Sequence, residues 1–142
     1  MILSSHLNYL LHKKKIELLN TVNDSISVFV DKNMLSLVIR NLISNAIKFT
    51  EENGFIKISA LMKDKFVEVT VEDNGVGISQ DNIKKLFRMD LYYSTDGTSN
   101  ESGTGLGLLL CKEIVDKYNG NIWVESELGK GSKFNFTIPV KD

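Results

Sequence analysis

The feature that most constrains the fold is an amphipathic stretch at residues 33–50. Apolar side chains recur there at the three- and four-residue spacing of an α-helix, which predicts one long helix with a buried stripe. The stripe consists of Leu35, Val38, Ile39, Leu42, Ile43, Ala46, Ile47 and Phe49. Asp31 precedes it, where a carboxylate can accept hydrogen bonds from the free amides of the first helical turn.

The same stretch carries a polar pattern. Asn41, Asn45 and Lys48 follow at i, i+4 and i+7 and project from one face of the expected helix. A solvated surface is the ordinary explanation for three such residues. However, two glycine-rich segments follow, at residues 73–77 and 103–107. Together the three segments favour a nucleotide site built from one helix face and two loops that phosphates can approach.

Composition limits the class of protein. A chain of 142 residues fits one domain with a sizeable core, and a net charge of −1 argues against a nucleic-acid partner. No run approaches the ~20 apolar residues of a membrane span, and no signal peptide is recognisable, so no membrane contact is expected. The single cysteine, Cys111, suits a reducing, cytoplasmic location. Its apolar neighbours predict a buried, unreactive thiol.

Periodicity and turn residues predict the remaining elements. Helices are expected at residues 2–15, 33–50, 79–87 and 106–118, the third capped by Ser79. Strands are expected at residues 16–19, 27–30, 55–60, 66–72, 122–125 and 133–138, and a loop at residues 88–102. This order predicts an α+β fold, a two-layer α/β sandwich in which a mixed sheet carries helices on one face.

The first glycine-rich segment begins with Asp73, at the end of an expected strand. A buried carboxylate needs hydrogen-bond partners, and the exocyclic amine of adenine is a suitable one. Gly75 and Gly77 permit positive φ and let a flat base approach the backbone. A loop turn with a capping aspartate explains the segment equally well when it is considered alone.

The second glycine-rich segment lies at the start of an expected helix. Exposed backbone amides and the positive end of the helix dipole suit a phosphate there, although a flexible hinge is the ordinary alternative. The spacing matches neither the dinucleotide fingerprint nor the P-loop. Asn41 and Asn45 offer the hard oxygen ligands that Mg²⁺ accepts beside phosphate oxygens, and Lys48 offers a point charge for terminal phosphates.

In order and spacing, these segments resemble the N, G1 and G2 boxes of the GHKL ATP-binding fold, specifically the catalytic domain of a sensor histidine kinase. Residues 40–50 are similar to the N box, residues 73–77 to the G1 box and residues 103–108 to the G2 box. Residues 86–87 resemble the start of the F box, although Asp90 stands near its usual second phenylalanine. The resemblance covers residues 16–139.

The resemblance implies a role for each residue. Asn45 ligates Mg²⁺ with Asn41 beside it, and Lys48 contacts the phosphates of ATP, so these three form the catalytic set. Asp73 holds the adenine amino group, and residues 88–102 become a lid over the nucleotide. The other nucleotide-binding positions are Gly75, Gly77, Gly103, Thr104, Gly105, Leu106 and Gly107.

The residue at position 41 distinguishes ATP hydrolysis from phosphoryl transfer. In ATP-hydrolysing relatives, such as gyrase and heat-shock chaperones, a glutamate stands there and activates water. The amide of Asn41 cannot act as a general base at neutral pH, so phosphoryl transfer to a nucleophile supplied elsewhere is favoured over hydrolysis. A degenerate, non-catalytic nucleotide-binding module and a GHKL serine kinase acting on a partner protein are the alternatives.

The two histidines lack the pattern of a phosphoacceptor helix. His6 has no acidic neighbour or downstream proline and His12 lies in a basic run, so both are expected to be ordinary surface residues. Residues 1–13 are therefore interpreted as the remnant of a preceding helix or linker, and residues 14–142 as the catalytic domain. The expected partners are the histidine-bearing dimerisation domain of a parent kinase, membrane-anchored or not, and a downstream response regulator receiver domain. This chain itself is expected to be monomeric.

Overall fold

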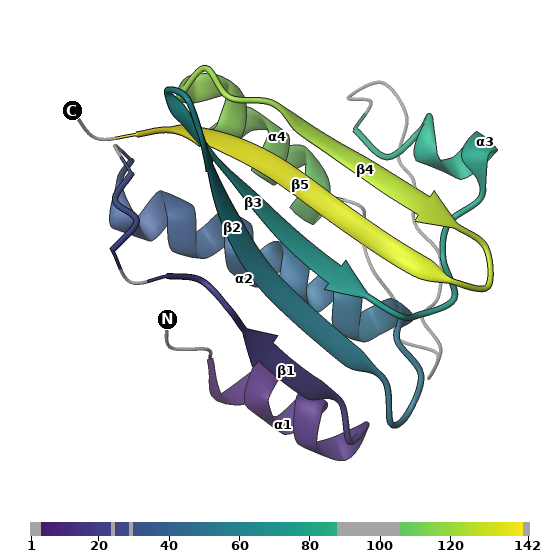
Figure 1. Cartoon of the computed structure of the whole chain (residues 1–142). Coiled ribbons are helices and arrows are strands. Elements are labelled where there is room, and N and C mark those ends of the chain that lie inside the picture. The colour runs from purple at the N-terminus through teal and green to yellow at the C-terminus, as the bar shows by residue number, and fades with distance from the viewer. Residues whose placement is uncertain (1–3, 24, 29, 88–105, 141–142) are drawn as a thin grey trace.

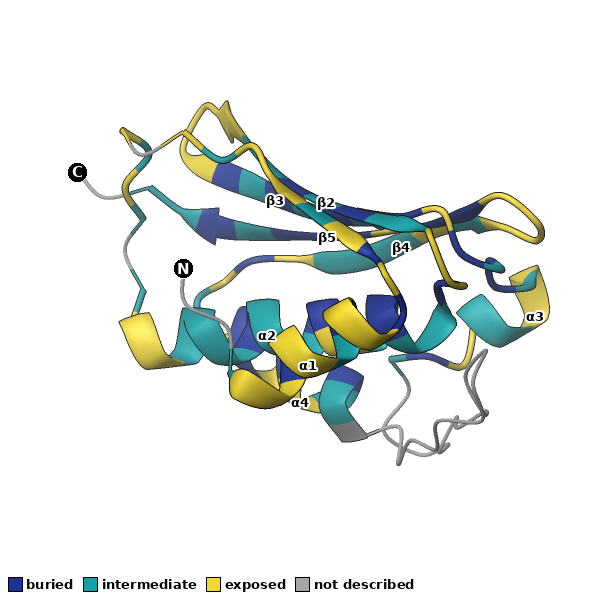
Figure 2. Ribbon diagram, turned by 90° about the horizontal axis from the view of Figure 1, so that it is seen from below, coloured by how far each residue is buried: buried dark blue, intermediate teal, exposed yellow. Residues whose placement is uncertain are grey.

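A computed structural model describes residues 4–23, 25–28, 30–87 and 106–140 of the chain. These residues form two layers, a mixed five-stranded sheet and a layer of helices that covers one of its faces (Figures 1 and 2). This arrangement confirms the predicted α+β sandwich.

The sheet has the order β1-β2-β3-β5-β4, in which β1 and β2 are parallel and the other neighbours are antiparallel. Its strands are β1 (Glu17–Asn20), β2 (Phe55–Lys63), β3 (Phe66–Asp73), β4 (Ile122–Glu127) and β5 (Gly131–Pro139). The strands expected at residues 55–60 and 66–72 are therefore confirmed, and they pair as an antiparallel hairpin.

The prediction of a strand at residues 27–30 is wrong for the part that the structure describes. Val28 makes only an isolated bridge with Val140, beyond the end of β5. β1 instead pairs with β2, which lies far along the sequence. The chain must turn into the next helix at Asp31, which leaves too little length for a ladder of hydrogen bonds.

The described helices are α1 (Ser5–Lys13), α2 (Lys32–Phe49), α3 (Gln80–Ile83) and α4 (Leu106–Lys117). Asp31 caps α2 as predicted, because its Oδ1 accepts from the amides of Asn33 at 2.8 Å and Met34 at 3.2 Å. Within the described ranges, no helix combines the length and the apolar character needed to cross a bilayer.

Helix α3 is shorter than the expected helix at residues 79–87. Ser79 caps it as predicted, with its hydroxyl oxygen 3.2 Å from the amide of Asn82. Beyond Ile83, however, the amides of Lys85 and Leu86 bond three residues back rather than four. Leu86 is buried, so its side chain draws the chain into the core and ends the helix.

The core lies between the sheet and the helices (Figure 2). Alternate residues of β3 are buried, which directs Val67, Val69 and Val71 toward the helix layer. Helix α2 contributes the predicted apolar stripe, and Phe134 and Phe136 of β5 are almost fully buried in the same core. Packing on this stripe fixes the rotation of α2 about its axis.

Truncation of the stripe tests its contribution to stability. Leu42→Ala removes a fully buried side chain and should lower the free energy of unfolding by about 2–5 kcal/mol, because a cavity remains. Chemical denaturation measures this loss. Leu61→Ala is the matched control, since Leu61 is 57% exposed, and it should change stability by no more than about 0.5 kcal/mol. Equal losses in the two variants would contradict the assignment of the core.

Candidate functional site

Asp73 is a buried carboxyl group at the end of β3. It continues the inward-facing series of that strand and is only 5% exposed. Its Oδ1 accepts a hydrogen bond of 2.8 Å from the amide of Gly75. Burial raises the pKa of Asp73 to about 6, although the backbone amides of Gly75 and Ser132 oppose this rise. Asp73 is thus an acceptor directed toward the helix layer.

The loop at residues 73–77 meets the end of α2. The amide of Val76 donates to the carbonyl of Phe49 at 3.0 Å. A Cβ on Gly75 would lie 2.1 Å from that same carbonyl oxygen, so the close approach requires glycine. Lys48 directly precedes Phe49, and its ammonium group lies 5.0 Å from the centroid of the Phe49 ring. The structure therefore brings the sequence-predicted Lys48 to the loop that contains Gly75.

The other side of this loop meets the turn between β4 and β5. Gly77 has a φ of +77°, and a Cβ there would lie 2.2 Å from the carbonyl oxygen of Glu127. The amide of Gly129 donates to the carbonyl of Val76 at 2.9 Å. The loop is therefore held between two backbones, which fixes its shape. Sequence reasoning did not assign Gly129 to the site, because only the strand pairing brings that turn here.

Helix α4 runs antiparallel to α2 and begins beside Asn41. A Cβ on Gly107 would lie 3.0 Å from Oδ1 of Asn41, and Cys111 donates to the carbonyl of Val38 at 3.7 Å. Asn41 also donates through Nδ2 to the carbonyl of Leu37 at 2.9 Å. The first turn of α4 thus lies next to the polar face of α2.

The structure describes only some of the remaining predicted site residues. Gly103, Thr104 and Gly105 lie outside the described residues, as does the side chain of Leu106. The F-box position Asp90 and the lid expected at residues 88–102 also fall outside them. Asn45 is half-buried on α2, one turn beyond Asn41.

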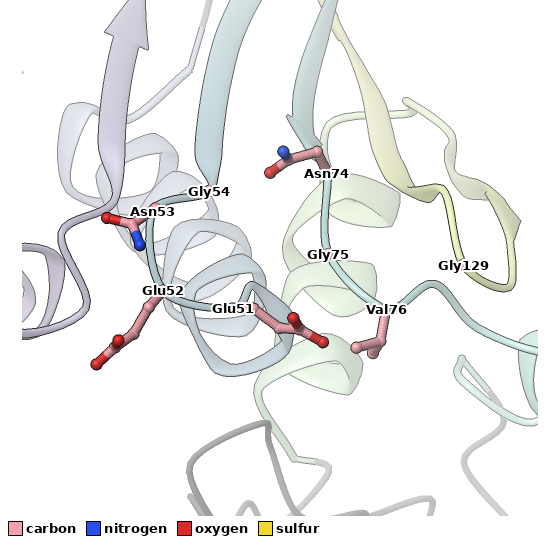
Figure 3. A pocket seen from close by; sticks show the side chains of 8 residues that line it. All are labelled: Glu51, Glu52, Asn53, Gly54, Asn74, Gly75, Val76 and Gly129. Atoms are coloured by element: carbon pink, nitrogen blue, oxygen red, sulfur yellow. The ribbon is translucent and has the colours of Figure 1, made fainter.

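A pocket of about 330 Å³ opens between the end of α2 and the loop at residues 73–77 (Figure 3). It is lined by Glu51, Glu52, Asn53, Gly54, Asn74, Gly75, Val76 and Gly129. In Figure 3 the side chain of Glu51 extends toward Val76, whereas that of Glu52 points away. Two carboxylates repel an anion, so this side of the site is unsuited to phosphate. The sequence analysis assigned neither glutamate to the site.

The donor set limits how a metal ion could be held. In the described part of the chain, no group of three or more His, Cys, Asp or Glu side chains could hold one. Mg²⁺ tolerates such a site, because one or two protein oxygens suffice when a ligand's phosphates and water complete its shell. The amide oxygens of Asn41 and Asn45 fit that requirement.

The histidines and the cysteine behave as predicted. His6 and His12 are exposed on α1. Cys111 is fully buried, and burial raises the pKa of its thiol to about 12. A thiol with so high a pKa is not a nucleophile at neutral pH, so Cys111 takes no chemical part in the site.

Comparison with known families gives one match across most of the chain. Residues 30–142 match the family described as histidine kinase-, DNA gyrase B- and HSP90-like ATPase. This range includes all the candidate site residues named above.

Two curated relatives are adaptive-response sensory kinases named SasA. The protein from Prochlorococcus marinus (strain MIT 9215) is 46% identical over 121 residues, which are 83% of this chain and 32% of the relative. The protein from Synechococcus elongatus is 41% identical over 115 residues, which are 80% of this chain and 29% of the relative. The chain therefore spans about a third of the length of the curated relatives it matches.

Solved structures of similar fold are also histidine kinases. The nucleotide-free catalytic domain of ThkA has a TM-score of 0.80 and 32% identity, with 96% of this chain and 88% of that chain covered. ThkA in complex with the response regulator TrrA has a TM-score of 0.75 and 29% identity, with 96% and 37% covered. Full-length ShkA in complex with AMPPNP has a TM-score of 0.76 and 28% identity, with 95% and 28% covered.

The buried carboxyl group gives a testable pH dependence. The pKa of Asp73 is about 6 in the folded protein, against an ordinary value of 3.8. The folded state therefore binds this proton more tightly than the unfolded state. The resulting stabilisation is complete below about pH 4 and is lost as the pH rises through about 6. Asp73→Asn removes the dependence.

Denaturation of the chain and of Asp73→Asn at about pH 4 and about pH 7 measures this effect. Between about pH 4 and about pH 7, the free energy of unfolding of the unchanged chain should fall, relative to that of the variant, by up to about 3 kcal/mol. The limit follows because one pKa unit corresponds to about 1.4 kcal/mol. Glu113→Gln is the control at an exposed carboxylate on α4 and should show no such difference. A relative stability of Asp73→Asn that is independent of pH would contradict the raised pKa.

Proposed function

Because this chain belongs to the histidine kinase-, DNA gyrase B- and HSP90-like ATPase family, we propose that it is the ATP-binding catalytic domain of a sensor histidine kinase. In this proposal residues 14–142 bind Mg-ATP and transfer its γ-phosphoryl group to a histidine on a separate domain of a parent protein. Residues 1–13 are assigned in this proposal to a preceding helix or linker. The observation that carries the proposal is the buried, inward-facing carboxyl group of Asp73, at a loop joined to the end of α2.

Asp73 recognises the adenine end of ATP. With a pKa of about 6 it is mostly ionised at neutral pH, and its oxygens are then acceptors for the exocyclic amine. Low exposure excludes competing water and strengthens such a bond. The glutamates of the adjoining pocket direct the phosphates away from this end.

The phosphates lie between the polar face of α2 and the start of α4. The positive end of the α4 dipole and the amides of residues 103–107 bind anionic oxygens. Lys48 adds a positive charge, and Asn45 together with Asn41 supplies amide oxygens for Mg²⁺. The metal ion neutralises charge on the phosphates when it is bound with ATP. This domain contributes position and electrostatic stabilisation to the transfer.

Transfer is favoured over hydrolysis by the residue at position 41. Asn41 has a neutral amide, donates to the carbonyl of Leu37 and cannot take a proton from water at neutral pH. The nucleophile therefore comes from a partner. A histidine on the dimerisation domain of the parent kinase takes this role, and a response regulator receives the phosphoryl group afterwards, like the regulator found with one similar kinase.

Titration calorimetry with AMPPNP, in the presence and absence of Mg²⁺, tests nucleotide binding. We expect binding at one site that strengthens with Mg²⁺, followed by phosphorylation of a separately produced acceptor domain when ATP is supplied. The product should be acid-labile, as phosphohistidine is. Asp73→Asn should weaken binding by roughly tenfold or more, because an amide N–H replaces an acceptor oxygen. Glu113→Gln, at an exposed carboxylate on α4, should bind like the unchanged chain.

Absence of binding by the unchanged chain would overturn the proposal. Binding of AMPPNP with equal affinity by Asp73→Asn would contradict the adenine assignment alone. Phosphoserine on an added partner protein, in place of phosphohistidine, would show that the serine-kinase alternative is correct.

Asn45→Ala tests the metal assignment. Loss of the amide oxygen should remove the dependence of AMPPNP affinity on Mg²⁺ and abolish phosphoryl transfer, because Asn45 supplies one of the few protein oxygens that this proposal assigns to the ion. The control is Ser44→Ala, whose side chain is exposed on the same helical turn. Retained transfer in Asn45→Ala would contradict the role of Asn45 as a Mg²⁺ ligand.

A further inference from the structure

Lys14 is a buried lysine immediately after α1. It is only 4% exposed, whereas its neighbours Lys13 and Lys15 are exposed. Lysine is almost never fully buried unless its ammonium group has partners, because removing that charge from water is costly. The burial of Lys14 therefore requires a specific interaction.

The partners of Lys14 are backbone carbonyls at the C-terminal end of α2. Its Nζ donates to the carbonyl oxygens of Ile47 at 2.8 Å, Thr50 at 3.2 Å and Lys48 at 3.4 Å. The last carbonyls of an α-helix have no partner within the helix, and the helix dipole makes this end negative. A buried ammonium group satisfies several of these carbonyls at once and adds a favourable charge.

The turn of α2 that Lys14 holds is also the turn that forms the site. It carries Lys48, and its next carbonyl, that of Phe49, accepts from the amide of Val76 in the loop at residues 73–77. The ammonium group and the loop thus bind neighbouring carbonyls of one helical turn. A shift of this turn would move Lys48 and the loop together.

The backbone of Lys14 is anchored as well. Its carbonyl accepts from the amide of Asn53 at 3.0 Å, in the turn that lines the pocket of Figure 3. On the other side, Leu7 and Leu11 of α1 are buried in the core. Lys14 therefore joins α1, the end of α2 and the wall of the pocket.

We propose that Lys14 is a positioning residue of the nucleotide site. Its ammonium group holds the last turn of α2, and through it Lys48 and the loop at residues 73–77, in the arrangement that binds nucleotide. A displacement of α1 is transmitted to the site by the same bonds. The inference rests on the proposed function, since it concerns affinity for ATP.

Two measurements on Lys14→Met test the inference, both made well below its unfolding temperature. Methionine keeps a similar length of chain but removes the ammonium group. AMPPNP affinity should fall by about tenfold, a typical size for coupling between two sites. Amide hydrogen exchange should quicken by about tenfold at Val76 and Thr50, whose amides bond to the end of α2, while amides in the β3–β5 ladder remain protected.

A purely structural role predicts a different result. In that case Lys14→Met would unfold at a lower temperature, but its folded fraction would bind AMPPNP with unchanged affinity. Lys14→Arg retains a charged donor and should restore most of the affinity. Lys13→Met is the matched control, because Lys13 is an exposed lysine one residue earlier, and it should bind like the unchanged chain. Should Lys14→Met not fold, Lys14→Gln replaces it and should also weaken AMPPNP binding, since a neutral amide has no charge and fewer donors than an ammonium group.

Unchanged affinity in Lys14→Met, or in Lys14→Gln if that variant is used, would overturn the inference and leave the proposed function intact. Unchanged exchange at Val76 and Thr50 would also overturn it. Failure of the unchanged chain to bind AMPPNP would overturn the proposed function and this inference together.

Discussion

The packing of α2 on the sheet is the constraint on which the rest of the structure depends. Val38, Leu42, Ile43, Ala46 and Ile47 are almost completely buried, so the helix can neither rotate nor slide without exposing apolar surface or leaving cavities. Because the apolar face of α2 is buried against the sheet, the direction of its polar face is fixed as well. The polar residues of α2 are therefore held beside α4 and the loop at residues 73–77, although they make no contribution to the core.

A helix packed in this way must still satisfy its terminal carbonyls. The carbonyls at the end of α2 are wholly or partly buried, so water cannot donate hydrogen bonds to all of them as it does at an exposed helix end. Thr50 donates its hydroxyl to the carbonyl of Ala46 at 2.6 Å, Lys14 donates to three carbonyls, and Val76 donates to that of Phe49. The requirement for hydrogen bonds thus gathers three distant segments at one point, and the candidate site lies at that point.

Electrostatics divides the site into two ends. Asp73 and the glutamates of the adjoining pocket make the end near the loop at residues 73–77 acidic, which suits an amine and repels phosphate. The positive end of the α4 dipole lies away from that loop, beside Asn41. A nucleotide with a base at one end and phosphates at the other matches this division, which is why the family assignment and the local chemistry agree.

The sequence by itself determined the features that depend on neighbours within a few residues. The apolar period of α2, its cap at Asp31 and the hairpin of β2 and β3 are local, and the structure agrees with all three. The expected strand at residues 27–30 was wrong because the chain turns into α2 at Asp31, so that Val28 makes only an isolated bridge with the distant Val140. The expected length of α3 was wrong because Leu86 is buried in the core. Only the tertiary structure decided that Asp73 has a raised pKa and that Lys14 is buried against α2. Both depend on groups far away in the chain, for which neither periodicity nor spacing gives a signal.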